Sequence, residues 1–199
     1  VGFGGSCFKK DILNLVYLCK SYGLNEVADY WMNVVSINDY QINRFSDIII
    51  TSLFNSINNK KISLLGWAFK KNTNDSRESA AIYVASKLLV EGADLYVFDP
   101  KVNESKMKLD LKMLFESRGM NEKEINNLLS NFTPCDDLDS CFTQSHAIAV
   151  LTEWDEFKKI DYKTVYKKMK KPCFIFDGRK ILDKKNLEKI GFNCYEIGK

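Results

Sequence analysis

The chain has 199 residues, of which 45% are hydrophobic and 28% charged, and its formal net charge is +3. This length suits one domain of ordinary size with an appended element, and the composition is typical of a globular protein. The 29 basic and 26 acidic residues are well mixed, which argues against a nucleic-acid-binding face, and no segment has the apolar length that a membrane span needs.

The cysteine pattern argues against a metal site. No two cysteines form a Cys-x-x-Cys pair, and His146 is the single histidine, so we expect no zinc site. Cys19 lies on an apolar helical face, and Cys173 and Cys194 fall in strand-like runs, which predicts buried free thiols. Free thiols are typical of a reducing compartment, so we expect a cytoplasmic protein. The cysteines stand at positions 7, 19, 135, 141, 173 and 194.

Residues 2–11 carry the clearest chemical signal. Glycines at positions 2, 4 and 5 precede Cys7, and an amphipathic pattern with Asp11 in its first turn follows. Glycine lets a backbone approach a ligand closely and adopt positive φ. A thiol at a helix N-terminus, followed here by Lys9 and Lys10, stands where a nucleophilic thiolate is favoured. The alternative is a loop with a buried small thiol, but the glycines and the Lys-Lys-Asp sequence favour a nucleophile.

Two helices are predicted before residue 57. Apolar residues recur at helical spacing from Ile12 to Cys19, and Gly23 suits the end of that helix. A second pattern runs from Asn25, a suitable N-cap, for about 30 residues without Pro or Gly. Its apolar face is broad, so we expect this long helix to be buried between domains or subunits. A two-stranded coiled coil is the weaker alternative.

From residue 58 onward strands and helices alternate. Continuous apolar runs predict strands at 61–67, 94–99, 147–152, 173–177 and 192–197. Helices are predicted at 75–89, within 104–131 with a turn at Gly119, and at 136–142, 155–158 and 161–169. Asp75 is expected to cap the helix over 75–89, with Glu78 completing a capping box. The alternation predicts an α/β fold with a parallel sheet covered on both faces, and it divides the chain into a helical region, 1–57, and a sheet domain, 58–199.

Such sheets bind ligands at the carboxyl ends of their strands, which here selects residues 66–71, 99–101 and 177–179. Residues 66–71 contain one glycine where a dinucleotide-binding domain carries GxGxxG, so we do not expect this half to hold NAD pyrophosphate in the usual way. Phe69 offers a ring for packing and Lys70 a charge for phosphate. The alternative for this pair is a core ring and a solvated amine.

Three more charged residues are candidates for ligand binding. Arg77 falls in the first turn of the predicted helix, where a cation opposes the helix dipole, and this favours either a ligand anion or a surface salt bridge. Arg179 follows Gly178 at a strand end and can bind a phosphate or sugar oxygen bidentately. Asp99 stands where a Rossmann second strand carries its ribose-binding acid, but that role is disfavoured without the glycine fingerprint.

Residues 2–11 resemble the catalytic loop of the nucleotide-sugar dehydrogenase family, especially its UDP-glucose branch. The resemblance extends over essentially the whole chain apart from 103–135, and it is specific because several motifs keep their order and spacing. The other matching motifs are Asn38-Asp-Tyr-Gln, Leu65-Gly-Trp-Ala-Phe-Lys-Lys, Asp75-Ser-Arg-Glu-Ser, Asp99-Pro-Lys-Val, Thr152-Glu-Trp and Phe176-Asp-Gly-Arg.

The resemblance implies an NAD-dependent oxidoreductase that converts the C6 alcohol of UDP-glucose to the carboxylate of UDP-glucuronate in two hydride transfers. Cys7 would match the nucleophile that carries a thiohemiacetal and then a thioester, and Asp11 the carboxylate that orients or activates the hydrolytic water. The family's NAD-binding domain precedes the matching region, and this chain begins without an initiator methionine. We therefore expect a C-terminal fragment that is inactive alone.

The resemblance also implies the contacts of the two small molecules. The long helix would be the family's interdomain and dimer helix, and residues 58–199 its Rossmann-like UDP-binding half. The implied substrate contacts are Val1, Gly2, Phe3, Gly4, Phe69, Lys70 and Arg179. The implied contacts of the NAD cofactor are Cys7, Phe8, Lys9, Lys10 and Arg77.

Two alternatives stay open on the sequence. A non-catalytic nucleotide-sugar-binding and dimerisation module is one, but such a module would need neither Cys7 nor Asp11. A sister dehydrogenase for GDP-mannose or a UDP-N-acetylhexosamine is the other, and Phe8 after the cysteine resembles the UDP-glucose branch more closely.

Overall fold

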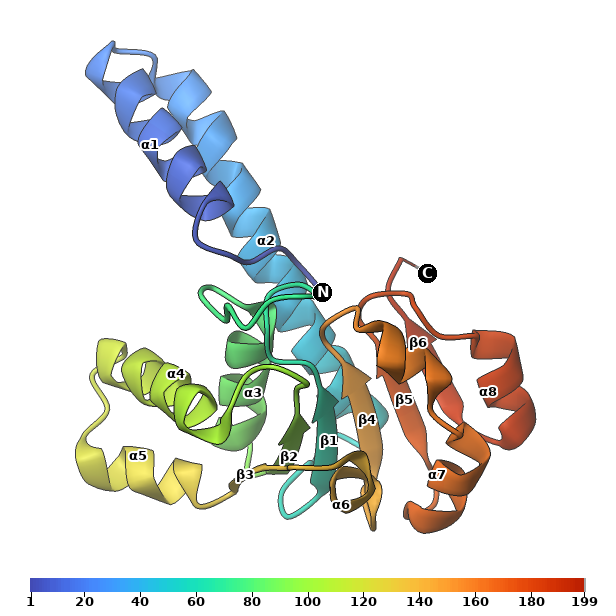
Figure 1. Ribbon diagram of the computed structural model, residues 1–199. Helices are drawn as coiled ribbons and strands as arrows, with labels where there is room; N and C mark the ends of the chain where they lie inside the picture. The colour runs from blue at the N-terminus through green and yellow to red at the C-terminus, as the bar shows by residue number, and fades with distance from the viewer. Residues whose placement is uncertain (199) are drawn as a thin grey trace.

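A computed structural model describes residues 1–198 and confirms the predicted α/β fold (Figure 1). A hairpin of α1 (Phe8–Ser21) and α2 (Asn25–Ser52) projects from the layered sheet region (Figure 1). The elements that follow are β1 (Lys61–Leu65), α3 (Ala80–Val90), β2 (Asp94–Phe98), α4 (Glu104–Ser117), α5 (Glu122–Leu129), β3 (Phe132–Pro134), α6 (Leu138–Phe142), β4 (Ala147–Val150), the 3₁₀ helix η1 (Asp155–Lys159), α7 (Tyr162–Lys168), β5 (Phe174–Asp177), α8 (Lys184–Ile190) and β6 (Asn193–Glu196).

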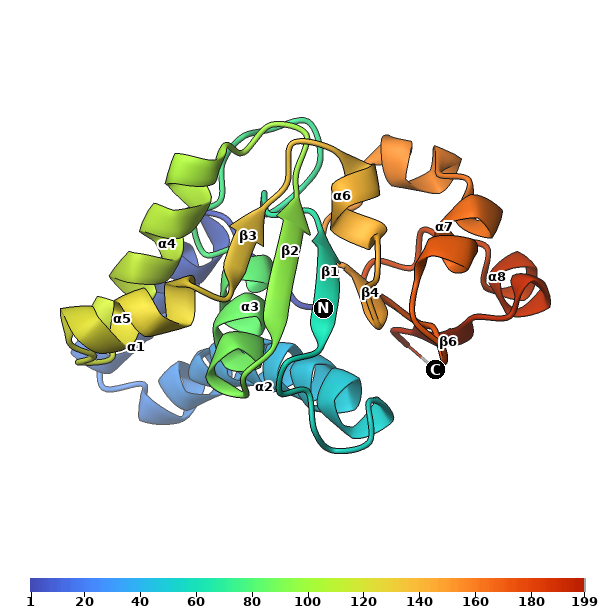
Figure 2. The ribbon, with the colours of Figure 1, turned by 90° about the horizontal axis from the view of Figure 1, so that it is seen from below.

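The sheet is parallel throughout, with the strand order β3-β2-β1-β4-β5-β6. This is the order of a Rossmann domain, in which the chain leaves from a central strand in both directions. Figure 2 shows α2 and α3 on one side of the sheet and α6 and α7 on the other. Both faces of the central strands are therefore covered, and the carboxyl ends of β1 and β4 lie at one edge.

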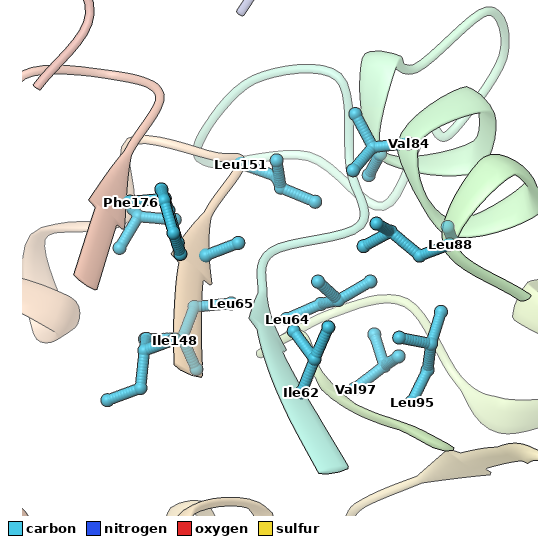
Figure 3. Packing of buried hydrophobic residues seen from close by; sticks show 14 of the residues in the cluster. Ile62, Leu64, Leu65, Val84, Leu88, Leu95, Val97, Ile148, Leu151 and Phe176 are labelled. Carbon is cyan, nitrogen blue, oxygen red and sulfur yellow. The ribbon is translucent and has the colours of Figure 1, made fainter. Parts of the chain in front are cut away.

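Burial on both faces explains why the strands have continuous apolar sequences rather than alternating ones. Every residue of β4 is buried, as are four of the five in β1. Figure 3 shows Leu64 and Val97 of the sheet beside Val84 and Leu88 of α3. The lower part of α2 joins this core through residues such as Phe45, so the long helix is anchored on the sheet.

The helix predicted over 75–89 begins later than expected. It starts at Ala80, and its N-cap is Ser79, whose hydroxyl accepts a hydrogen bond from the Ala81 amide at 3.3 Å. Asp75 and Glu78 lie in the preceding loop, so the predicted cap and capping box are wrong. The Asp75 carboxylate instead accepts bonds from the Arg77 amide and guanidinium. Arg77 is consequently outside any helix, and the dipole argument does not apply to it.

Some of the other predicted helix and strand boundaries are confirmed, and others are wrong. Gly23 ends α1 as predicted, with φ of +74° and its amide bonded to the Lys20 carbonyl. The N-cap of α2 is Leu24, which has no capping side chain, so the prediction for Asn25 is wrong. Strand β3 and helix α8 were not predicted, because β3 has three residues and Leu187 is the one buried residue of α8. No helix within residues 1–198 is long and apolar enough to cross a membrane.

Candidate active site at the carboxyl edge of the sheet

Residues 1–7 are held by α2 at the carboxyl edge of the sheet. The Asn38 side chain accepts a hydrogen bond from the Phe3 amide at 2.7 Å and donates one to the Phe3 carbonyl at 3.1 Å. Asn38 is 7% exposed. Because buried amides need both partners, this pairing fixes the position of the loop. The sequence analysis names Asn38 only as part of a matching motif and predicts no role for it. Its position as a polar residue on the apolar face of the long helix could have indicated one.

The glycines of this loop serve close contacts with the protein itself. A Cβ on Gly4 would lie 2.3 Å from the Glu78 carbonyl oxygen, and one on Gly5 would lie 2.8 Å from the Phe69 ring. Gly5 also has φ of +90°, and its amide donates to the Arg77 carbonyl at 2.8 Å. These glycines therefore allow a close approach to the loop that follows β1, whereas the predicted approach to a ligand stays a prediction.

Replacing Gly4 with alanine is expected to push residues 1–7 away from the loop after β1. Overpacking of this kind costs about 1–3 kcal/mol, which urea unfolding would measure. Hydrogen exchange would show faster exchange of the Gly5 amide, which bonds to Arg77. Gly23→Ala is the control, because Gly23 has positive φ but a Cβ added there would have no neighbouring atom within 4 Å. Unchanged exchange at Gly5 in Gly4→Ala would contradict the expected displacement.

Cys7 and Asp11 lie on successive turns at the start of α1. Cys7 is the N-cap residue, and its carbonyl accepts a hydrogen bond from the Asp11 amide at 2.8 Å. Both side chains are exposed, and the Ser6 hydroxyl lies 3.7 Å from the Cys7 sulfur. The helix N-terminus predicted for the thiol is thus present. The thiol and the carboxylate are therefore both accessible to solvent, one turn apart at the start of α1.

An ion pair ties α1 to the sheet region directly after Cys7. The Lys9 ammonium and the Tyr83 hydroxyl both donate to one Glu78 oxygen at 2.8 Å. Burial alone would raise the pKa of Glu78, but these two hydrogen bonds lower it below its ordinary value. Glu78 is therefore a carboxylate at neutral pH and holds the amine of Lys9, while Lys10 is exposed.

A cavity of about 720 Å³ lies between α1, α4 and the segment that precedes α3. Its lining includes the cationic side chains of Lys9, Lys10, Arg77 and Lys106. Arg77 is bonded to Asp75 at 2.7 Å, and this hydrogen bond lowers the pKa of the Asp75 carboxyl. The salt bridge considered for Arg77 is therefore present, and the residue also borders a hollow with a surplus of positive charge.

Arg179 joins three segments that are far apart in the chain. Its guanidinium donates to the carbonyl oxygens of Leu151 at 2.7 Å, Gly2 at 3.2 Å and Phe69 at 3.5 Å. Glu153 lies 3.5 Å from the same group, and the Arg179 side chain is 17% exposed. The structure thus brings Arg179 together with the opening loop and with the segment after β1.

The remaining predicted contacts lie around this junction in different environments. Val1 is buried in the core and packs beside Gly178. Phe3 stacks edge-on against the exposed Phe8, with ring centroids 4.6 Å apart. Lys70 is exposed, with its ammonium 5.4 Å from the centroid of the half-buried Phe69 ring. Val1 therefore contributes packing, whereas Phe8 and Lys70 are exposed to solvent.

Asp99 has a structural role that differs from ribose binding. One of its carboxylate oxygens accepts bonds from the Trp67 and Ala68 amides and the Trp154 indole, at 2.6, 3.0 and 3.1 Å. The other accepts from two amides of the following turn, Lys101 and Val102, both at 2.9 Å. With five donors and 8% exposure, this carboxylate fixes the loops around the edge.

Among residues 1–198, no group of three or more His, Cys, Asp or Glu side chains could hold a metal ion.

The strand order and the ligand edge define a Rossmann-like nucleotide-binding domain, here joined to a cysteine-bearing helical hairpin. Residues 63–184 match the model of the UDP-glucose/GDP-mannose dehydrogenase family, UDP binding domain. Residues 1–40 match the central-domain model of the same family. The chain belongs to the UDP-glucose/GDP-mannose dehydrogenase family.

Curated relatives match over the whole of this chain. It is 47% identical to UDP-glucose 6-dehydrogenase 4 of Arabidopsis thaliana and 49% identical to the UDP-glucose 6-dehydrogenases of Pongo abelii and Drosophila melanogaster. The matched region is 100% of this chain but only 42%, 40% and 41% of those proteins. The chain therefore spans about two-fifths of the length of its relatives.

Solved structures show the same fold. A UDP-glucose dehydrogenase from Pyrobaculum islandicum aligns with a TM-score of 0.67 and 27% identity, over 98% of this chain and 37% of that one. An NDP-N-acetyl-D-galactosaminuronic acid dehydrogenase from Methanosarcina mazei aligns with a TM-score of 0.74 and 21% identity, over 100% of this chain and 38% of that one. The second likeness is evidence for the fold alone.

Proposed function

We propose that this chain supplies the reactive thiol and the UDP-sugar-binding half of an NAD-dependent UDP-glucose 6-dehydrogenase, which converts UDP-glucose to UDP-glucuronate. The observation that carries the proposal is the placement of Cys7. Its thiol is exposed at the start of α1, and the loop before it is bonded to the edge of a sheet that matches the family's UDP-binding domain. A purely binding module would need neither this thiol nor Asp11.

The proposed chemistry proceeds through two covalent states of Cys7. Its thiolate adds to the carbonyl carbon of the intermediate aldehyde and forms a thiohemiacetal, and oxidation of that adduct leaves a thioester. Asp11, one turn further along α1, orients the water that attacks the thioester carbonyl. The C–S bond then breaks, so that the carboxylate product leaves and the thiol is regenerated.

NAD⁺, when bound, would accept one hydride in each oxidation step, so that two NAD⁺ are consumed per sugar. The lining of the cavity beside α1 has four cationic side chains against the carboxylates of Glu78 and Asp110, and this surplus of positive charge fits an anionic cofactor. We assign Cys7, Phe8, Lys9, Lys10 and Arg77 to its surroundings. The loop after β1 has a single glycine, Gly66, and does not fit the pyrophosphate of a dinucleotide. The sheet of this chain is therefore assigned to the substrate.

UDP-glucose is assigned to the junction that Arg179 holds together. Arg179 and Lys70 provide positive charge for the diphosphate, and the Phe69 ring provides a flat apolar surface. Residues Val1, Gly2, Phe3 and Gly4 form the adjoining wall on the sugar side. The relatives named as UDP-glucose dehydrogenases favour glucose over the other hexoses.

A second copy of the chain is the proposed partner of the α1–α2 hairpin. Large side chains along it are exposed, among them Tyr17 and Tyr22 on α1 and its end and Tyr30, Ile37 and Tyr40 on α2. Such a surface is typical of a protein–protein interface. We also propose a cytoplasmic location, because all six cysteines are free thiols.

Steady-state kinetics of the full-length protein test the substrate assignment. We expect UDP-glucose to have a higher kcat/KM than GDP-mannose or UDP-N-acetylglucosamine, with two NADH formed per sugar oxidised. Lys70→Ala is expected to raise the KM for UDP-glucose about tenfold, equivalent to about 1.4 kcal/mol of lost phosphate attraction. The matched control is Lys71→Ala, since the neighbouring Lys71 pairs with Asp155 at 2.8 Å instead. A preference for either other sugar nucleotide, or equal effects of both variants, would contradict the assignment.

A further inference from the structure

Helix α6 covers the sheet face opposite α3 (Figure 2), and it carries one of two neighbouring cysteines, while the other follows β3. Cys135 directly follows β3, and its amide donates to the Val97 carbonyl at 2.8 Å. Cys141 lies in α6, and its thiol donates to the Tyr96 carbonyl at 3.2 Å. Both residues are thus attached to consecutive residues of β2. The two thiols are also close enough for the ionisation of each to affect that of the other.

A lysine provides positive charge at the same place. The Lys61 ammonium donates to the carbonyl of Ser140, the residue before Cys141, at 2.8 Å. It also lies 3.5 Å from the centroid of the Tyr96 ring, a cation–π contact on the same strand that holds both cysteines. A cation held beside two thiols stabilises whichever of them ionises.

The environments of the two thiols are unequal. Cys141 is fully buried, and this burial raises its pKa well above the ordinary value. Cys135 is half-buried, and the neighbouring Cys141 thiol, with further contributions from Ser140 and Lys61, lowers its pKa to about 7 despite that burial. The titratable groups acting on it are thus Cys141 on α6 and Lys61 on β1. At neutral pH Cys135 is therefore partly ionised, whereas Cys141 keeps its proton.

We propose that Cys135 and Cys141 form a peroxide-reactive dithiol, in which Cys135 is the attacking thiol and Cys141 the resolving one. The Cys135 thiolate attacks one oxygen of a hydroperoxide, the O–O bond breaks, and the leaving alkoxide or hydroxide takes up a proton. Sulfur is oxidised to a sulfenic acid and the peroxide is reduced to an alcohol or water. The Cys141 sulfur then attacks the Cys135 sulfur, the S–O bond breaks, and the hydroxyl leaves with the Cys141 proton as water. The product is a disulfide between Cys135 and Cys141.

This site is independent of the proposed dehydrogenase chemistry. Neither cysteine lies in residues 1–11, at Arg179 or in the loop after β1, so neither belongs to the groups assigned to substrate or cofactor. The reaction needs only a hydroperoxide and the two thiols. A failure of the dithiol assignment would leave the role of Cys7 unaffected, and the reverse also holds.

Alkylation of the wild-type full-length protein provides the first test, with Cys194 as the internal reference. Cys194 is also half-buried, but burial and the nearby Glu188 raise its pKa to about 11. At pH 7 the thiolate fractions differ by about four powers of ten, and the lower nucleophilicity of the more acidic thiol offsets about two of them. Iodoacetamide with peptide mapping should therefore modify Cys135 about 100-fold faster than Cys194. Equal rates would overturn the proposal.

Peroxide treatment provides the second test. Brief exposure of the reduced protein to hydrogen peroxide should yield a peptide linked between Cys135 and Cys141, detected by mass spectrometry without reduction. In Cys141→Ala the reaction should stop at a Cys135 sulfenic acid that dimedone traps, whereas Cys194→Ser should still form the disulfide. Absence of both the disulfide and the dimedone adduct at Cys135 would overturn the proposal even if one variant folds poorly, because the wild-type result suffices.

Discussion

Replacing Cys7 with serine in the full-length protein is expected to abolish turnover while leaving UDP-glucose binding intact. A hydroxyl at this position is a far weaker nucleophile, and without the covalent adduct neither the thiohemiacetal nor the thioester can form. Loss of a catalytic nucleophile reduces kcat by several powers of ten, so a decrease of more than about 10³-fold is expected. Binding should persist because the diphosphate contacts assigned to Arg179 and Lys70, and the apolar surface of Phe69, come from other elements.

Calorimetric titration with UDP-glucose and NADH formation would measure the two effects separately in Cys7→Ser. Cys194→Ser is the matched control, because Cys194 lies on β6, an edge strand that two other strands separate from β1. It should retain both turnover and binding. If Cys7→Ser kept most of its activity, the thiol would not carry the intermediate. That result would favour the alternative of a non-catalytic nucleotide-sugar-binding module.

Asp99→Asn is expected to cause the largest loss of stability. The carboxylate accepts five hydrogen bonds, from four backbone amides and an indole, at 8% exposure. In asparagine, an NH₂ group replaces one of the two carboxylate oxygens and cannot accept hydrogen bonds. At least two of the five donors therefore lose their acceptor. Each buried donor without a partner costs about 1–3 kcal/mol, so the free energy of unfolding should fall by about 2–6 kcal/mol.

Urea unfolding of Asp99→Asn and of Asp94→Asn would measure this loss. Asp94 begins β2, the strand that Asp99 directly follows, and its substitution should change the free energy of unfolding by less than about 0.5 kcal/mol. Equal effects of the two variants would show that the hydrogen bonds of Asp99 do not hold the edge together.

Much of the fold follows from local patterns. Long apolar runs such as 147–150 can be buried only in a covered parallel sheet, and they predicted five of the six strands. Strand β3 escaped detection because three residues that include Pro134 carry almost no periodic signal. The start of α3 was misplaced because the sequence around Asp75 and Glu78 resembles a capping box. Contacts with distant residues, such as the Ser76 hydroxyl bonded to Asp110 at 2.5 Å, hold that segment out of the helix.

The candidate site could be predicted only in part. The chemistry of Cys7 and the ligand edge of the sheet follow from residue types and from general rules for parallel sheets. The contact between the opening loop and the sheet edge could not be predicted from local patterns, because Gly2 and Arg179 are 177 residues apart. The resemblance to a known family implied both as substrate contacts. The role of Asn38, which bonds both polar atoms of the Phe3 backbone, became visible only in three dimensions.

Acid quenching of an Asp11→Asn variant during turnover would identify the residue that carries the acyl group. With Asp11 no longer available to direct water, hydrolysis should slow more than oxidation, so the thioester should accumulate. Peptide mapping by mass spectrometry after reaction with UDP-glucose and NAD⁺ should find a UDP-glucuronyl group on the peptide that contains Cys7, at higher occupancy than in the wild type. Product formation without any adduct on Cys7, or an adduct on another residue, would contradict the assignment of the thiol.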